Sequence, residues 1–179
     1  MRVVAGEAGG RQLVAPEGTN TRPTSDRVRE AIFNMLFSLD AIDDARVCDL
    51  YAGSGALGIE ALSRGAASCV FVERDRAAIE AIHENLETLG FEDRATVVQA
   101  DVLTWIDRAA GDSAEFDLVL ADPPYAEEDW DTLLDRIDSA IFVAESSTPI
   151  AANPRWVALR EKKYGTTLVS VFTRNRSDS

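Results

Sequence analysis

The chain has 179 residues, with 31 acidic and 18 basic side chains, a formal net charge of −13 and 46% hydrophobic residues. This length and composition are typical of one ordinary globular domain, so we expect a single domain over 1–179 with an N-terminal arm at about 1–25. No run approaches the roughly 20 apolar residues that cross a bilayer, so we expect a cytoplasmic protein with no membrane partner. Two cysteines and one histidine are too few for a disulfide framework or a multi-histidine metal site, so no metal is expected.

The charge is distributed unevenly along the chain. Residues 1–29 have five bases and three acids, residues 155–179 have six bases and two acids, and residues 30–154 have seven bases and 26 acids. The overall charge argues against a generic nucleic-acid binder, because attraction to phosphates needs a basic surface. The two basic ends are either incidental tails or the part that meets a nucleic acid, and charge alone leaves both readings open.

The pattern of apolar residues predicts alternating helices and strands. Residues 5–25 are rich in Gly, Thr and Pro and indicate a loop, and Thr24 or Ser25 can cap a helix that begins near Asp26. Strands are expected at 46–50, 69–73, 95–100, 116–121 and 140–145, helices at 56–64, 76–89, 103–109 and 129–137, and a closing hairpin at 156–161 and 166–173.

This alternation predicts a three-layer, doubly wound α/β fold, in which right-handed crossovers place helices on both faces of a parallel sheet. The closing hairpin adds an antiparallel strand to that sheet. Ligands of such folds bind beyond the carboxyl ends of the strands. Four polar clusters follow strands directly, at 49–55, 73, 101 and 122–125.

The first cluster is a glycine-rich turn between a strand and a helix. Gly53 and Gly55 allow a sharp turn and a close approach of ligand to backbone, and with Gly58 they spell G-x-G-x-x-G. The following helix points its N-terminal N–H groups at such a ligand. A purely structural turn explains the same pattern. The candidate cofactor-binding residues of this cluster are Asp49, Tyr51, Ala52, Gly53, Ser54 and Gly55.

Acidic residues end the next two strands. Glu73 can accept hydrogen bonds from both hydroxyls of a ribose, which suits a nicotinamide cofactor and S-adenosylmethionine equally. Asp101 can accept a hydrogen bond from an adenine amino group while the backbone of Val102 reads the ring edge. An exposed carboxylate at Glu73 and a helix N-cap at Asp101 are the structural alternatives. Arg74 completes this set of candidate cofactor residues.

The sequence Asp122-Pro123-Pro124-Tyr125 follows the fourth strand and supplies the candidate catalytic residues. An exocyclic amine on an aromatic base is a poor nucleophile because its lone pair is delocalised into the ring. Asp122 and the carbonyl of Pro123 can accept its two N–H hydrogens, the two prolines hold these acceptors rigidly, and Tyr125 can stack on the base. The pattern favours methylation of an amine by positioning and electrostatics, without a metal.

Several of these segments resemble the RsmD-type methyltransferases of bacteria. The similar segments are 22–34 (RPTSDRVREAIFN), 49–65, 72–75 and 122–125, with a further likeness at 9–13, and the resemblance extends from about Arg2 to Arg174. It implies S-adenosylmethionine-dependent methylation of the N2 amine of a guanine in small-subunit (16S) ribosomal RNA. It also implies a seven-stranded sheet of order 3-2-1-4-5-7-6 with strand seven antiparallel. The chain departs from the family in its net charge and in a shorter segment between Leu134 and Ile141, which predicts a trimmed helix before strand five.

The expected partner is small-subunit ribosomal RNA, within an assembling ribosomal particle, bound by a monomer. The target base must leave its stack to reach Asp122, and without a separate recognition domain specificity must come from RNA shape. The candidate phosphate contacts are Arg11, Arg22 and Arg27, with Arg2 and Arg29 as further candidates and salt-bridge roles as the alternative. The alternative functions are a DNA adenine-N6 methyltransferase, a nicotinamide dehydrogenase and a non-catalytic nucleotide-binding module.

Overall fold

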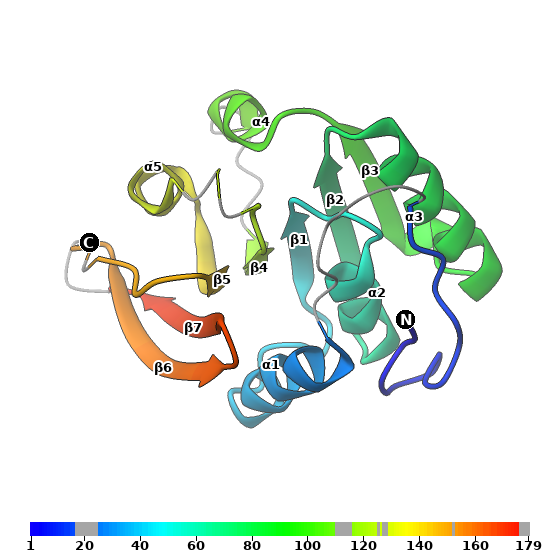
Figure 1. Ribbon diagram of the computed structural model, residues 1–179, viewed down its shortest axis with the longest axis horizontal. Coiled ribbons are helices and arrows are strands. Elements are labelled where there is room, and N and C mark those ends of the chain that lie inside the picture. Colours follow the sequence, from blue (N-terminus) through cyan, green and yellow to red (C-terminus); the bar gives the residue numbers. More distant parts are fainter. Residues whose placement is uncertain (17–24, 110–115, 125, 127–128, 152, 176–179) are drawn as a thin grey trace.

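The computed structural model describes residues 1–16, 25–109, 116–124, 126, 129–151 and 153–175. Its centre is a seven-stranded sheet of order β3-β2-β1-β4-β5-β7-β6 (Figure 1). The strands are β1 (Arg46–Leu50), β2 (Ser68–Glu73), β3 (Ala95–Gln99), β4 (Phe116–Ala121), β5 (Ser139–Ser146), β6 (Trp156–Tyr164) and β7 (Thr167–Arg174). Strands β1 to β5 pair in parallel, and β7 is antiparallel to both of its neighbours. The predicted fold class, strand order and antiparallel seventh strand are therefore confirmed.

The helices cover both faces of the sheet (Figure 1). They are α1 (Asp26–Ser38), α2 (Ala56–Ser63), α3 (Arg76–Leu89), α4 (Val102–Ala109) and α5 (Trp130–Arg136), with a 3-10 turn, η1 (Glu92–Arg94), that the pattern did not predict. Apolar residues of α1, α2 and α3 share one buried cluster, and those of α4 and α5 share another. The sheet separates the two clusters because successive side chains of a strand point to opposite faces.

Helix ends follow the capping residues. The Ser25 hydroxyl accepts a hydrogen bond from the Val28 N–H at 3.2 Å, which confirms Ser25 as the cap of α1. The Asp129 carboxylate accepts one from the Thr132 N–H at 3.2 Å, so α5 begins one residue later than predicted. It has seven residues, and the expected trimming relative to the family stays a prediction. Strand β6 runs three residues beyond the predicted end at 161, because β7 supplies pairing partners as far as Tyr164.

Residues 1–16 of the N-terminal arm have more regular backbone contacts than the predicted loop implies. Arg2 and Gln12 form an antiparallel bridge, and the Val3 N–H donates to the Arg11 carbonyl at 2.9 Å. The side chains of Val3 and Leu13 are buried in the cluster under α1, α2 and α3. The arm is thus part of the core on this face.

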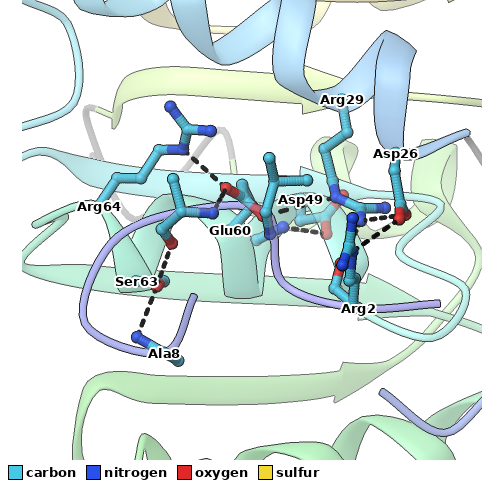
Figure 2. A network of polar contacts seen from close by, with 11 residues as sticks. Arg2, Ala8, Asp26, Arg29, Asp49, Glu60, Ser63 and Arg64 are labelled. Atoms are coloured by element: carbon cyan, nitrogen blue, oxygen red, sulfur yellow. Dashed lines mark hydrogen bonds and ion pairs between the residues drawn. The ribbon is translucent and has the colours of Figure 1, made fainter. Parts of the chain in front are cut away.

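A buried glutamate of α2 holds the arm in place (Figure 2). Glu60 is 0% exposed, and its two carboxylate oxygens accept hydrogen bonds from the N–H groups of Val4 at 2.8 Å and Ala5 at 3.0 Å. One turn later, the Ser63 hydroxyl accepts from the Ala8 N–H at 3.0 Å. Such burial of a carboxylate is tolerable only when its charge is paired and its oxygens are hydrogen-bonded.

Two arginines supply the opposite charge. The Arg64 Nε donates to Glu60 at 2.7 Å, and the Arg29 Nε lies 3.5 Å from the other Glu60 oxygen. Arg29 is itself 0% exposed, and its Nη2 donates to Asp26 at 2.8 Å and to the Arg2 carbonyl. The hypothesis that Arg29 contacts phosphate is therefore wrong, because this guanidinium is committed to the contacts between α1, α2 and the arm.

Candidate functional site

The strand register brings the predicted clusters to one edge of the sheet. Leu50 of β1 pairs with Val72 of β2 and Ala121 of β4. The residues that follow these three, Tyr51, Glu73 and Asp122, therefore emerge side by side at the carboxyl ends of their strands. Glu73 pairs in turn with Gln99 of β3, two residues before Asp101. Sequence clusters more than 70 residues apart thus meet at a single edge.

Asp49 anchors the glycine-rich turn from below. Its side chain is 1% exposed, and its Oδ2 accepts a hydrogen bond from the Gly58 N–H at 2.8 Å. Burial raises the pKa of Asp49 well above its usual value, the Gly58 hydrogen bond opposes that rise, and the nearby charges of Asp122 and Glu73 add to it. These contacts make Asp49 a support of the turn, and its role toward a cofactor stays a prediction.

The turn concentrates unusual backbone conformations. Tyr51, Gly53 and Gly55 have φ of 58°, 56° and 78°. A tyrosine in this left-handed region costs on the order of 1 kcal/mol or more, and such strain gathers at functional sites. The sequence pattern gave no sign of this at Tyr51. A Cβ built on Gly53 would meet no atom of the described residues within 4 Å, so this part of the turn borders open space in that part of the chain.

Gly58 has a different role from the other glycines of the motif. A Cβ there would lie 2.4 Å from Cε1 of Phe71 and 2.7 Å from Sγ of Cys69, both on β2. Gly58 therefore allows α2 to pack closely on the sheet, which is the role of the third glycine in dinucleotide-binding turns.

Glu73 braces the turn from the neighbouring strand. One carboxylate oxygen accepts from the Gly53 N–H at 2.8 Å, and the other accepts from the N–H groups of Arg74 at 2.7 Å and Asp75 at 2.8 Å. A carboxylate has about four lone-pair positions, so acceptor capacity remains for a ligand hydroxyl. Glu73 is half-buried and Arg74 is exposed.

Asp101 caps α4. Its Oδ1 accepts hydrogen bonds from the N–H and from the hydroxyl of Thr104, both at 3.0 Å. The Thr104 N–H lowers the pKa of Asp101, and the charge of Arg74 lowers it further. The N-cap alternative from the sequence is thus confirmed, while a contact with adenine stays a prediction. Val102, the next residue, buries its side chain in the core, so that only its backbone is left for a ligand.

The candidate catalytic residues follow β4 directly. Asp122 is half-buried, Pro123 is buried and Pro124 is exposed. Asp122 follows Ala121, which pairs with Leu50 of β1, and its charge adds to the raised pKa of Asp49. Tyr125 lies outside the described residues, as does Arg22 among the proposed phosphate contacts.

The other two proposed phosphate contacts lie on the surface. Arg27 on α1 is exposed. Arg11 is exposed as well, and its Nη2 donates to the carbonyl of Thr88 at 3.0 Å. Thr88 is in the last turn of α3, which starts at the carboxyl edge and returns toward the start of β3. Arg11 therefore lies toward the amino ends of the parallel strands, whereas Asp122 lies at their carboxyl ends.

Asn85 of α3 is a site residue that the sequence reasoning missed. It is 2% exposed, and its Nδ2 donates to the carbonyls of Ser54 at 3.1 Å and Val14 at 3.0 Å. Its Oδ1 accepts from the Val14 N–H at 2.7 Å. One amide thus joins the glycine turn to Val14 of the arm. The available signal was a polar residue on the apolar face that Ala81, Ile82 and Leu86 form.

In the described part of the chain, no group of three or more His, Cys, Asp and Glu side chains is arranged to hold a metal ion. No helix among the same residues has both the length and the apolar character needed to cross a membrane.

Comparison with known proteins gives concordant matches along the whole chain. The model of a family described as conserved hypothetical protein 95 matches residues 1–173. The protein YlbH of Bacillus subtilis is 40% identical over 97% of this chain and 99% of its own length. Ribosomal RNA small subunit methyltransferase D of Escherichia coli is 36% identical over 97% of this chain and 90% of its own length. The solved structure of the Escherichia coli protein yhhF superimposes with a TM-score of 0.81 at 33% identity, over 98% of each chain.

Proposed function

Because this chain belongs to the conserved hypothetical protein 95 family, the RsmD family, we propose that it is an S-adenosylmethionine-dependent methyltransferase. Its substrate is the N2 exocyclic amine of a guanine in small-subunit ribosomal RNA. The observation that carries this proposal is the meeting of Asp122-Pro123 with the glycine turn and Glu73 at one edge of the sheet. The relative from Escherichia coli is named for methylation of small-subunit ribosomal RNA.

The residues at this edge suit S-adenosylmethionine. Glu73 retains acceptor capacity for a ribose hydroxyl beside its three backbone contacts, and Gly53 borders open space. Asp101 and the Val102 backbone follow the adjacent strand, where the adenine end would lie. The set of candidate cofactor residues is Asp49, Tyr51, Ala52, Gly53, Ser54, Gly55, Glu73, Arg74, Asp101 and Val102. When bound, the cofactor supplies an electrophilic methyl group on a sulfonium centre.

Asp122 and Pro123 prepare the amine. The Asp122 carboxylate accepts one N2–H hydrogen and the Pro123 carbonyl accepts the other, so the nitrogen is fixed with its lone pair directed out of the plane of the base. The rigid Pro123-Pro124 pair holds both acceptors with little conformational freedom to lose. Asp122 can also take the proton that the amine gives up as its bond to the methyl carbon forms. Tyr125 is proposed to stack on the base, a contact worth about 1–3 kcal/mol.

The proposed substrate is presented within an assembling ribosomal particle in the cytoplasm and is bound by a monomer. The described residues form one sheet with its covering helices. We propose that the shape of the folded RNA selects the guanine. Arg11, Arg22 and Arg27 remain proposed contacts with its phosphates.

Single-turnover transfer of labelled methyl groups to small-subunit particles tests the proposal. The parent should produce N2-methylguanine in digested RNA. The Asp122→Ala variant should transfer about 10²-fold more slowly, the scale of losing one positioned hydrogen-bonding group in a transition state, while Asp122→Asn retains more activity because its amide oxygen still accepts. The exposed Asp131 of α5 provides a matched control, Asp131→Ala, which should transfer at the parental rate.

Calorimetry with S-adenosylhomocysteine should give unchanged affinity for Asp122→Ala, because the proposed cofactor residues come from the first three strands. Parental transfer by Asp122→Ala would refute the mechanism. Methylated adenine in duplex DNA, with none in ribosomal RNA, would favour the DNA methyltransferase alternative.

A further inference from the structure

Strand β6 forms an edge of the sheet that is exposed on both faces. Among the described residues it pairs only with β7, and its seven residues from Val157 to Lys163 are all exposed. Three of the seven, Arg160, Lys162 and Lys163, are basic, and Glu161 is acidic. We call these three bases the β6 basic edge. It is a local positive surface on a chain whose formal charge is −13.

Two other bases near the C-terminus, Arg155 and Arg174, already have polar partners. Arg155 donates to the carbonyls of Leu134 and Ile137, each at 3.4 Å, and Arg174 pairs with Asp138. Within the described part of the chain, no acidic side chain forms an ion pair with Arg160, Lys162 or Lys163. The Lys162 ammonium lies 5.4 Å from the ring centre of Tyr164, so a cationic side chain lies next to an aromatic ring.

The register places this basic edge beside the candidate catalytic residue. Ala121 pairs with Ala144, Ala144 with Ser170, and Ser170 with Glu161. The residues one step further toward the carboxyl edge, Asp122 and Lys162, therefore stand in one row across β4, β5, β7 and β6. Three strand spacings of about 4.8 Å separate them by about 14 Å.

Both side chains also belong to the same face of the sheet. Lys162 lies opposite Val169, whose side chain is in the cluster under α1, α2 and α3. Asp122 is two residues after Leu120, which is in that same cluster, and alternate residues of a strand share a face. Arg160, opposite Val171, continues this face.

Charged side chains also protect edge strands from pairing with other chains. That role needs charge of either sign, and acids outnumber bases 31 to 18 in this chain. Bases at the part of the edge closest to Asp122 are better explained by an anionic partner. From this row of residues, we propose that the β6 basic edge docks the phosphate backbone of RNA next to the nucleotide whose base enters the site at Asp122. This inference rests on the proposed function.

The test compares two variants of equal charge. One carries Arg160→Gln, Lys162→Gln and Lys163→Gln. The control carries Arg46→Gln, Arg108→Gln and Arg136→Gln at exposed positions. These positions are at the start of β1 and at the ends of α4 and α5, toward the amino ends of the parallel strands and away from Asp122. Affinity for a small-subunit RNA fragment is measured over a series of salt concentrations, together with KM, kcat and affinity for S-adenosylhomocysteine.

The β6 variant should bind RNA more weakly than the control, with a higher KM and unchanged kcat and cofactor affinity. Loss of three phosphate contacts should reduce the slope of log K against log salt by about 2, at about 0.7 for each contact with single-stranded RNA. The control should keep the parental slope.

Equal RNA affinity and equal slopes for the two variants would overturn the docking proposal. So would a β6 variant that self-associates in sedimentation while its RNA affinity stays parental, since the bases would then be protecting the edge. A parent that transfers no methyl group to small-subunit RNA would refute the proposed function instead, and the binding slopes would still decide whether the β6 basic edge docks RNA.

Discussion

Replacing Asn85 with alanine tests whether the arm and the glycine turn are physically linked. The change removes three hydrogen bonds, two to Val14 and one to the Ser54 carbonyl. Each contributes about 0.5–1.5 kcal/mol, and a buried carbonyl left without a donor adds to the loss, so Asn85→Ala should destabilise the protein by about 3 kcal/mol. In a protein of this size that corresponds to a fall in Tm of about 6–12 °C.

The same change should weaken cofactor binding, because the Ser54 carbonyl lies within the turn that we propose holds the cofactor. If the variant loses about 1 kcal/mol of the free energy that holds this turn in its binding conformation, the Kd for S-adenosylhomocysteine should rise about fivefold. Thermal unfolding and calorimetry measure the two effects separately. The exposed Asn34 of α1 supplies the control, Asn34→Ala, which should change neither quantity.

Asn85→Asp sharpens this test. It keeps the acceptor for the Val14 N–H but replaces two donated hydrogen bonds with a charge that faces two carbonyls. It should therefore be at least as damaging as alanine at neutral pH. A Tm within about 1 °C of the parent for Asn85→Ala, where a loss of several degrees is expected, would refute the proposed link. An unchanged Kd with a lowered Tm would restrict Asn85 to a purely structural role.

Two other positions give predictions of different kinds. Gly58→Ala should lower stability by about 1–3 kcal/mol through overpacking, because its Cβ would lie 2.4 Å from the Phe71 ring and 2.7 Å from the Cys69 sulfur; an unchanged denaturation midpoint would contradict this. Asp49→Asn should change how stability depends on pH. Since burial raises the pKa of folded Asp49 above its unfolded value, the folded state binds more protons than the unfolded state between those two values. The contribution of Asp49 to the parent's free energy of unfolding is therefore fully present at low pH, and it is lost as the pH rises from about 4 toward the folded pKa. The variant cannot ionise, so its stability relative to the parent should increase with pH in denaturant titrations. A constant difference would show that Asp49 is not the titrating group.

The fold class could be predicted because one local pattern of apolar residues recurs along the sequence. Short apolar runs such as 116–121 alternate with helical stretches, and that alternation requires a parallel sheet covered on both faces. The position of the candidate site followed from the same rule, since ligands gather at the carboxyl edge. The strand order came from the resemblance to a family. Spacing alone does not specify which strands are neighbours, because that depends on contacts between distant parts of the chain.

The contacts that hold the site together could not be predicted in this way. Arginine and glutamate are residue types that usually lie on the surface. Only the tertiary structure shows that Arg29 and Glu60 are fully buried and paired. Tyr51 adopts a left-handed conformation that its residue type disfavours, so no propensity points to it. Asn85 was visible only as a polar residue on an apolar helical face. In each case a long-range contact overrides the local preference.

The placement of α2 explains why so much buried polarity surrounds a short helix. At its amino end the N-cap Gly55 joins the eight-residue helix to the turn that Glu73 and Asn85 brace. At its carboxyl end Glu60 and Ser63 bind the backbone of the arm. An apolar contact would hold the arm nearly as strongly but would tolerate sliding, whereas hydrogen bonds to individual N–H groups fix one register. We expect a displacement of residues 1–16 to shift α2 and the glycine turn with it, so this part of the arm influences the geometry of the site through Glu60 and Ser63.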